Sequence, residues 1–226
     1  RRIHIGMDEA GMLGRGQYLR RNGYRSNHQI MLEHLTRVVE LCRKYDYQPI
    51  MWSDMFFSSC SPDDNYYDLV APIPQHVIDS VPDNVTLVYW HYGSVDEETD
   101  DIMIKRHKLF KARTTFAGGL STWSGMTPGY GSAVYSAKIA LRQCFKHGID
   151  EAIATAWGDN GQECNLLSAL YGFQVWAEMG YHEGIFHDEY TKSRFKACVG
   201  VDASAFIDIS RLDAVDGVVP PPNFYV

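Results

Sequence analysis

Residues 2–9 read R-I-H-I-G-M-D-E, a short apolar run, Arg2–Met7, that ends directly in Asp8 and Glu9. A glycine-rich loop follows these two acids. A brief apolar run bounded by turn residues is typical of a buried β-strand. A bare Asp-Glu pair is most often a pair of solvated loop acids. Here the pair follows a strand directly and precedes a tight turn, which favours a functional role for both carboxylates.

The pattern of a strand followed by a helix repeats along the chain. Four further strands are predicted at Gln48–Phe57, Val85–Tyr92, Thr115–Leu120 and Glu151–Ala156. Helices are predicted at Asn27–Tyr45, with Ser26 or Asn27 as its N-cap, and at Gln75–Ser80, Asp96–Ala112, Ala133–His147 and Leu166–Met179. Five strand-then-helix units in succession predict an α/β protein with a parallel sheet.

Each predicted strand ends in an acidic or aromatic cluster. In chain order the clusters are Asp8/Glu9, Trp52/Asp54, Trp90/Tyr92, Trp123 and Trp157/Asp159. Functional side chains at the carboxyl ends of successive strands are typical of the TIM (β/α)8 barrel, whereas a doubly wound sheet concentrates its site at one switch point. Five units cannot close an eight-stranded barrel. We therefore expect a partial barrel over residues 1–180, about strands four to eight.

Beyond residue 180 the repeat stops, and we expect a helical C-terminal extension over residues 181–226. Two helices are predicted in it, at Thr191–Gly200 and Ala203–Leu212, followed by an irregular tail at Gly217–Val226. At the other end, the sequence begins with Arg1 in a strand-like segment. We therefore expect a natural N-terminal part that lies outside this sequence.

Composition narrows the range of partners. The 226 residues carry a formal net charge of -7 without a dense Lys/Arg stripe, which argues against nucleic acid. No apolar run approaches the ~20 residues of a membrane span. Five cysteines without CxxC spacing argue against a zinc site and a disulfide scaffold, and they slightly favour a reducing, cytoplasmic compartment. Aromatic residues make up 13% of the chain, which suits sugar binding as well as an aromatic core.

Several motifs together resemble one enzyme family. Ile3–Glu9 resembles the H-x-G-x-D-E motif of glycoside hydrolase family 20, the β-N-acetylhexosaminidases. The later strand ends, Met51–Asp54 (MWSD), Tyr89–Gly93 (YWHYG) and Trp157–Asp159 (WGD), follow the family's order over roughly the first 180 residues. The loop Gly11–Leu19 resembles that of the single-chain bacterial subgroup. The resemblance implies an exo-acting hydrolase that releases terminal β-linked GlcNAc or GalNAc with retention, without a metal or other cofactor.

In this family the substrate supplies its own nucleophile, the 2-acetamido oxygen. The resemblance implies that Glu9 is the general acid/base and that Asp8 orients the acetamide. A general acid must be protonated when turnover begins, so we expect burial to raise the pKa of Glu9.

The remaining strand-end residues are candidates for the substrate pocket. Aromatic walls around the acetamide methyl are predicted from Trp52, Trp90 and Trp157, with Trp123 in a loop as a fourth candidate. Tyr92 could donate to the acetamide oxygen, although the family places such a Tyr one strand later, where this chain has Thr122-Trp123-Ser124. Asp54 and Asp159 are candidate polar lining residues, and Asp159 could equally cap the following helix. We predict that His4 is a core histidine bonded to backbone.

Two other functions fit the same residues. One is another retaining barrel glycosidase that uses Glu9 with a distant nucleophile, for which Glu163 could be proposed. The other is a non-catalytic carbohydrate-binding barrel, although binding alone does not need an acid/base. All three functions imply a glycan as the partner. The family resemblance implies that this glycan is a β-N-acetylhexosaminide. The open edges of a partial barrel would be covered by association between copies or by missing chain, and the fragment alone could be inactive.

Overall fold

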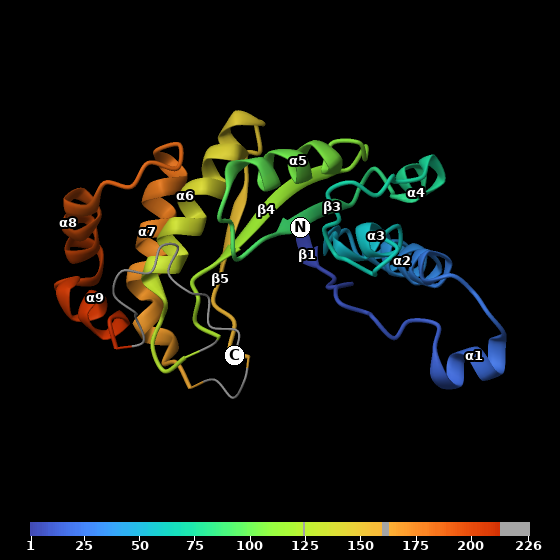
Figure 1. Ribbon diagram of the computed structural model, residues 1–226, viewed down its shortest axis with the longest axis horizontal. Coiled ribbons are helices and arrows are strands. Elements are labelled where there is room, and N and C mark those ends of the chain that lie inside the picture. Colours follow the sequence, from blue (N-terminus) through green and yellow to red (C-terminus); the bar gives the residue numbers. More distant parts are fainter. Residues whose placement is uncertain (124, 160–162, 213–226) are drawn as a thin grey trace. The chain divides into compact units, whose positions relative to one another are not determined.

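The computed structural model describes residues 1–123, 125–159 and 163–212 (Figure 1). Its sheet has the strand order β1-β2-β3-β4-β5. The strands are β1 (Arg2–His4), β2 (Gln48–Trp52), β3 (Thr86–Trp90), β4 (Arg113–Gly119) and β5 (Ala152–Thr155). β1 pairs with β2, β2 with β3, and β4 with β5, each time in parallel. The predicted α/β class with a parallel sheet is confirmed, and this order is compatible with part of a (β/α)8 barrel.

Helices follow the strands in the predicted alternation. They are α1 (Gly16–Asn22), α2 (Asn27–Lys44), α3 (Asp54–Ser58), α4 (Gln75–Ser80), α5 (Glu97–His107), α6 (Tyr130–Lys146), the 3-10 turn η1 (Leu166–Ala169), α7 (Leu170–Tyr181), α8 (Asp188–Val199) and α9 (Ser204–Ser210). Among the described residues, none of these helices has the length and apolarity needed to cross a membrane.

Two local predictions differ from the structure. The strand expected over Gln48–Phe57 ends at Trp52, and Asp54–Ser58 forms α3. Every residue of α3 is buried, so the apolar pattern could not distinguish a helix from a strand there. The second difference is α1, which was not predicted. None of its seven residues is buried, so it has no apolar periodicity to indicate a helix.

The chain divides into two compact units. The first consists of Arg1–Trp90 with Ile102–Thr115, and the second of His91–Asp101 with the described residues from Phe116 onward. Strand β4 therefore begins in the first unit and ends in the second. The domain boundary expected at residue 180 is a different division of the chain and stays a prediction.

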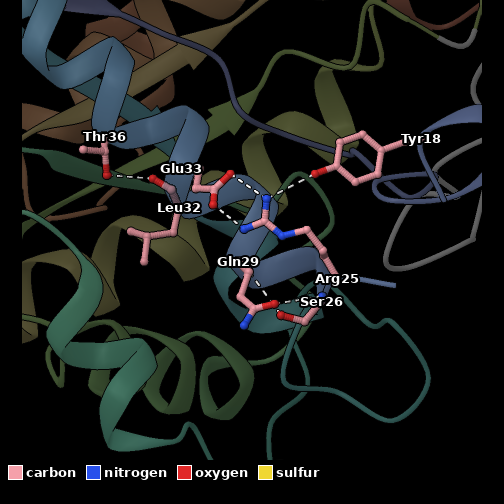
Figure 2. Close-up of polar contacts among 7 residues, drawn as sticks. All are labelled: Tyr18, Arg25, Ser26, Gln29, Leu32, Glu33 and Thr36. Atoms are coloured by element: carbon pink, nitrogen blue, oxygen red, sulfur yellow. Dashed lines mark hydrogen bonds and ion pairs between the residues drawn. The ribbon is translucent and has the colours of Figure 1, made fainter. Parts of the chain in front are cut away.

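In the first unit, α2 and α3 bury their apolar side chains together with β2 and β3. The core contribution of α2 comes from Met31, Leu35, Val39 and Cys42, a helical spacing of apolar residues. Ser26 caps this helix, as predicted: its side chain accepts the Gln29 N–H, and the Gln29 side chain accepts the Ser26 N–H (Figure 2). This capping box satisfies two backbone donors that would otherwise lack a partner. Beside it, the Arg25 guanidinium binds Tyr18 of α1 and Glu33 of α2, which ties the two helices together (Figure 2).

In the second unit, α6 packs against α7, and the end of β4 lies against aromatic rings. Gly118 of β4 lies so close to Trp176 of α7 that a Cβ atom would be 2.3 Å from the indole. Tyr171 of α7 then packs edge-to-face on Phe195 of α8 at 5.4 Å between centroids. The two C-terminal helices predicted from the sequence are thus confirmed, within a few residues of their expected bounds.

Candidate functional site

The acid pair lies on a backbone of unusual conformation. After β1 the chain adopts positive φ at Gly6 (69°), Met7 (80°) and Glu9 (51°). Outside glycine this left-handed region is uncommon and costs about 1–3 kcal/mol for each residue, so it persists only where the surroundings hold it. Two such residues flank Asp8. Strain of this kind clusters at functional sites, and it recurs in this chain at Asp46, Asp64 and Glu183.

Hydrogen bonds from β2 and α3 hold this loop. The Trp52 N–H donates to the Gly6 carbonyl at 3.1 Å, and the Glu9 N–H donates to Oδ2 of Asp54 at 2.9 Å. A local turn follows, in which the Gly11 N–H donates to the Glu9 carbonyl at 2.8 Å. The left-handed residue Glu9 is therefore fixed through both its backbone N–H and its carbonyl.

Asp54 is an internal residue and not a lining one. Its side chain is fully buried, Oδ2 accepts the Glu9 N–H, and Oδ1 accepts the indole Nε1–H of Trp90 at 3.3 Å. Burial raises the pKa of Asp54 to about 6; the hydrogen bonds from Glu9 and Trp90 oppose the shift, and the nearby Asp8 carboxylate adds to it. Asp54 was predicted as a polar lining residue, but in the structure both its oxygens accept hydrogen bonds from protein groups.

Trp90 is half-buried in an aromatic group from the loop between β2 and β3. Its backbone N–H donates to the Tyr67 hydroxyl at 3.2 Å, and the rings of Tyr66 and Tyr67 lie 5.9 Å and 5.5 Å from its own. The pKa of Tyr66 is raised, chiefly by burial and then by the carboxylates of Glu9, Asp54 and Asp8. The ring contact with Trp90 places Tyr66 beside the site. No sequence motif includes Tyr66, and the only signal for it was its place beside a second Tyr in a polar loop.

Trp52 and His4 lie together beside the acid loop. Trp52 is 8% exposed, and its ring lies 4.5 Å from that of His4. The imidazole Nδ1 of His4 accepts the Gly6 N–H at 3.1 Å, so the predicted bond to backbone is present. The prediction of a core position is wrong, because all three residues of β1 are exposed.

The burial that we expected at Glu9 is not found in the structure. The side chains of Asp8 and Glu9 are both exposed, and the buried carboxyl of the group is Asp54. Burial was predicted for Glu9, the acid at the end of the motif. In the structure the buried acid is Asp54, which accepts a hydrogen bond from the backbone N–H of Glu9.

The second unit brings together three more candidates. Trp123 is 5% exposed and packs on Gly119, where a Cβ atom would lie 2.4 Å from the indole. The Tyr92 ring lies 5.3 Å from that of Trp123. Thr122 donates its hydroxyl to the Trp157 carbonyl at 2.7 Å, which fixes the backbone of a tryptophan that is 38% exposed.

Asp159 is exposed, and it does not cap the helix that follows. The cap is Asn165, whose side chain accepts the Leu167 N–H at the start of η1. The capping alternative for Asp159 is therefore wrong, while its predicted contact with sugar hydroxyls stays a prediction.

The second unit also contains a cavity of about 580 Å³ between β5, α6 and α7. None of the predicted site residues lines it. Among residues 1–123, 125–159 and 163–212, no group of three or more His, Cys, Asp or Glu side chains is arranged to hold a metal ion.

Comparison of the chain with protein-family models and with curated protein sequences found no match.

Proposed function

We propose that this chain carries the catalytic part of an exo-acting β-N-acetylhexosaminidase of the glycoside hydrolase family 20 type, on strands four to eight of a (β/α)8 barrel. One observation carries the proposal. Asp8 and Glu9 follow β1 on a left-handed loop, and the buried Asp54 joins the backbone of Glu9 to Trp90. An acid pair on a specifically held loop beside an aromatic ring is what a substrate-assisted glycosidase requires.

The adjacency of the two acids fits this mechanism. The substrate's 2-acetamido oxygen attacks the anomeric carbon while Glu9 donates a proton to the leaving oxygen, and Glu9 then removes a proton from the incoming water. Asp8 accepts the acetamide N–H and offsets the positive charge of the cyclic intermediate. In an extended strand, neighbouring side chains point to opposite faces, and the left-handed φ of Glu9 removes that constraint.

The aromatic residues take the role of pocket walls in this proposal. The resemblance to the family assigns Trp52, Trp90, Trp123, Trp157 and Tyr92 to the acetamide pocket. Such walls hold the acetamide carbonyl over the anomeric carbon. The bound substrate is then already in the geometry from which the carbonyl oxygen attacks, a geometry that is rare in free solution. Asp159 is assigned to sugar hydroxyls, and Tyr66 is a further polar group beside the acids.

The test combines binding with turnover. GlcNAc-thiazoline mimics the cyclic intermediate, and we expect the chain to bind it in calorimetry and Asp8→Asn to bind it at least tenfold more weakly. With 4-nitrophenyl N-acetyl-β-glucosaminide, Glu9→Gln should lower kcat about 10²–10⁴-fold. Replacing the N-acetyl group by N-trifluoroacetyl should slow wild-type turnover, because the carbonyl oxygen becomes a weaker nucleophile.

Each alternative has its own outcome. Turnover that thiazoline does not inhibit, and that Glu163→Gln abolishes, would indicate a retaining glycosidase with a protein nucleophile. Binding of GlcNAc without any effect of Glu9→Gln would indicate a carbohydrate-binding barrel. Absence of both thiazoline binding and turnover in the folded chain would contradict the proposal for this polypeptide.

A further inference from the structure

We infer that Asp54 is the positioning residue of this site: one carboxylate oxygen holds the left-handed backbone of Glu9 and the other holds the indole of Trp90. A single buried group thereby sets the proposed general acid and a pocket wall together. The catalytic meaning of this inference rests on the proposed function, whereas the link between the three residues does not.

The two contacts need a carboxylate. Both partners, the Glu9 N–H and the Trp90 Nε1–H, are donors, so both positions around Asp54 require an acceptor. An ionised carboxylate is the side chain that accepts at two oxygens and donates at neither. An asparagine at this position would present one acceptor and one donor, and it could satisfy only one of the two partners.

Asp54 is itself fixed by the residue before it. The Ser53 N–H donates to the Val88 carbonyl of β3 at 3.1 Å, and the Ser53 hydroxyl donates to the same carbonyl at 2.8 Å. The Ser53 oxygen also lies 2.8 Å from Nε2 of the fully buried His107. Hydrogen bonds and one peptide bond therefore connect the acid loop to β3, in the order Glu9, Asp54, Ser53 and Val88.

This arrangement gives Asp54 a role without sugar contact. Its buried oxygens face protein donors, and its titratable neighbours are Asp8, Glu9 and Tyr66. Loss of the Glu9 contact would release a backbone conformation that costs energy to maintain, and the acid would move relative to the leaving oxygen. A displacement of about 1 Å in a catalytic group can lower a rate 10²-fold.

The link can be measured without any activity. In the ¹⁵N-labelled full chain, the Trp90 indole N–H resonance, assigned with Trp90→Phe, should move with pH as the Asp54 carboxyl titrates. The same resonance should lose this dependence in Asp54→Asn. In Asp79→Asn, which changes an exposed acid of α4, the Trp90 resonance should titrate as in the wild type. A Trp90 resonance that ignores both pH and Asp54→Asn would overturn the inference.

The catalytic consequence has a signature that a merely structural role would not produce. A misplaced general acid matters most when the leaving group is a poor one, so we expect Asp54→Asn to lower kcat at least tenfold more for a 4-methoxyphenyl than for a 2,4-dinitrophenyl N-acetyl-β-glucosaminide. Equal losses for the two substrates, or none, would contradict a positioning role. Asp79→Asn should leave both rates unchanged.

Failure of the proposed function and failure of the inference about Asp54 would give different results. If the Trp90 resonance titrates through Asp54 but the wild type neither binds thiazoline nor hydrolyses either substrate, the proposed function fails and the link between the residues stands. If the wild type is active and Asp54→Asn is folded and equally active, the inference fails and the function stands. If Asp54→Asn does not fold, Asp54→Glu retains the charge but displaces its oxygens, and the same ratio of the two substrates decides.

Discussion

At Asp54, burial and hydrogen bonding act on the pKa in opposite directions, and burial dominates. The pKa rises from 3.8 to about 6. Below pH 4 the carboxyl is protonated in both the folded and the unfolded chain. Between pH 4 and 6 the unfolded chain releases the proton first, so the folded chain binds more protons and its stability falls as pH rises. A raised carboxyl pKa thus stabilises the fold at low pH and loses that contribution through this window.

We therefore expect Asp54→Asn to change the pH dependence of stability. The raised pKa of Asp54 corresponds to about 3 kcal/mol of free energy of unfolding at low pH. The wild type loses this contribution between pH 4 and pH 7. The variant does not, because asparagine has no carboxyl group to titrate. Urea unfolding of both proteins at pH 4.5, 6 and 7.5 measures the difference. Parallel curves for the two proteins would show that Asp54 has an ordinary pKa in the folded chain.

Gly119 provides a second test at the level of one residue. A Cβ atom there would lie 2.4 Å from the Trp123 ring and 3.1 Å from that of Tyr92. We expect Gly119→Ala to destabilise the chain by about 1–3 kcal/mol, because a closely packed ring must move. Gly180→Ala is the control, since no atom lies within 4 Å of its Cβ position and Ala favours α7, so its stability should stay equal or rise. Equal effects of both changes on the free energy of unfolding would contradict the packing of Trp123 on β4.

At the scale of the element, α2 depends on its N-terminus. Ser26 and Gln29 form a reciprocal capping box there (Figure 2). We expect Ser26→Ala to lower the free energy of unfolding by about 1 kcal/mol, because the Gln29 N–H loses its acceptor. Thr36→Ala removes an exposed hydroxyl that donates to the Leu32 carbonyl within the same helix, and it should stay within about 0.5 kcal/mol of the wild type. A Ser26→Ala effect no larger than that of Thr36→Ala would argue against the cap.

The elements also show how far the sequence can predict this molecule. Apolar periodicity and strand-end clusters indicated all five strands and their parallel order, because those signals are local. They failed at α3, where complete burial removes periodicity, and at α1, where no residue is buried. In the candidate site the acid pair and Trp90 were predicted from motifs. The role of Asp54 was not, because its bond to Glu9 joins residues 45 positions apart and only the fold brings them together.

At the scale of the whole molecule, the two compact units have one strand in common. Arg113–Thr115 of β4 belongs to the first unit and Phe116–Gly119 to the second. A continuous strand cannot unravel in one unit without disturbing the ladder of the other. We therefore expect the two units to unfold together, in one cooperative transition.

The five free thiols can test this, because they are buried to different degrees in the two units. Cys42 is buried in the first unit and Cys144 and Cys164 in the second, whereas Cys60 is half-buried and Cys198 exposed. In native buffer a thiol reagent should modify Cys198 first and Cys60 more slowly, since burial raises the pKa of Cys60 and the thiolate is the reactive form. Cys198→Ser should remove the fast phase alone.

With increasing urea, Cys42 and Cys144 should become reactive at the same midpoint, as determined by mass spectrometry of the modified peptides. This midpoint should match the loss of circular dichroism, because a buried thiol that reacts only on global unfolding reports the global free energy. A lower midpoint for Cys42 than for Cys144 would mean that the unit carrying the acid pair opens by itself. The shared strand would then not couple the two units, and the geometry around Asp8, Glu9 and Asp54 would depend on the stability of the first unit alone.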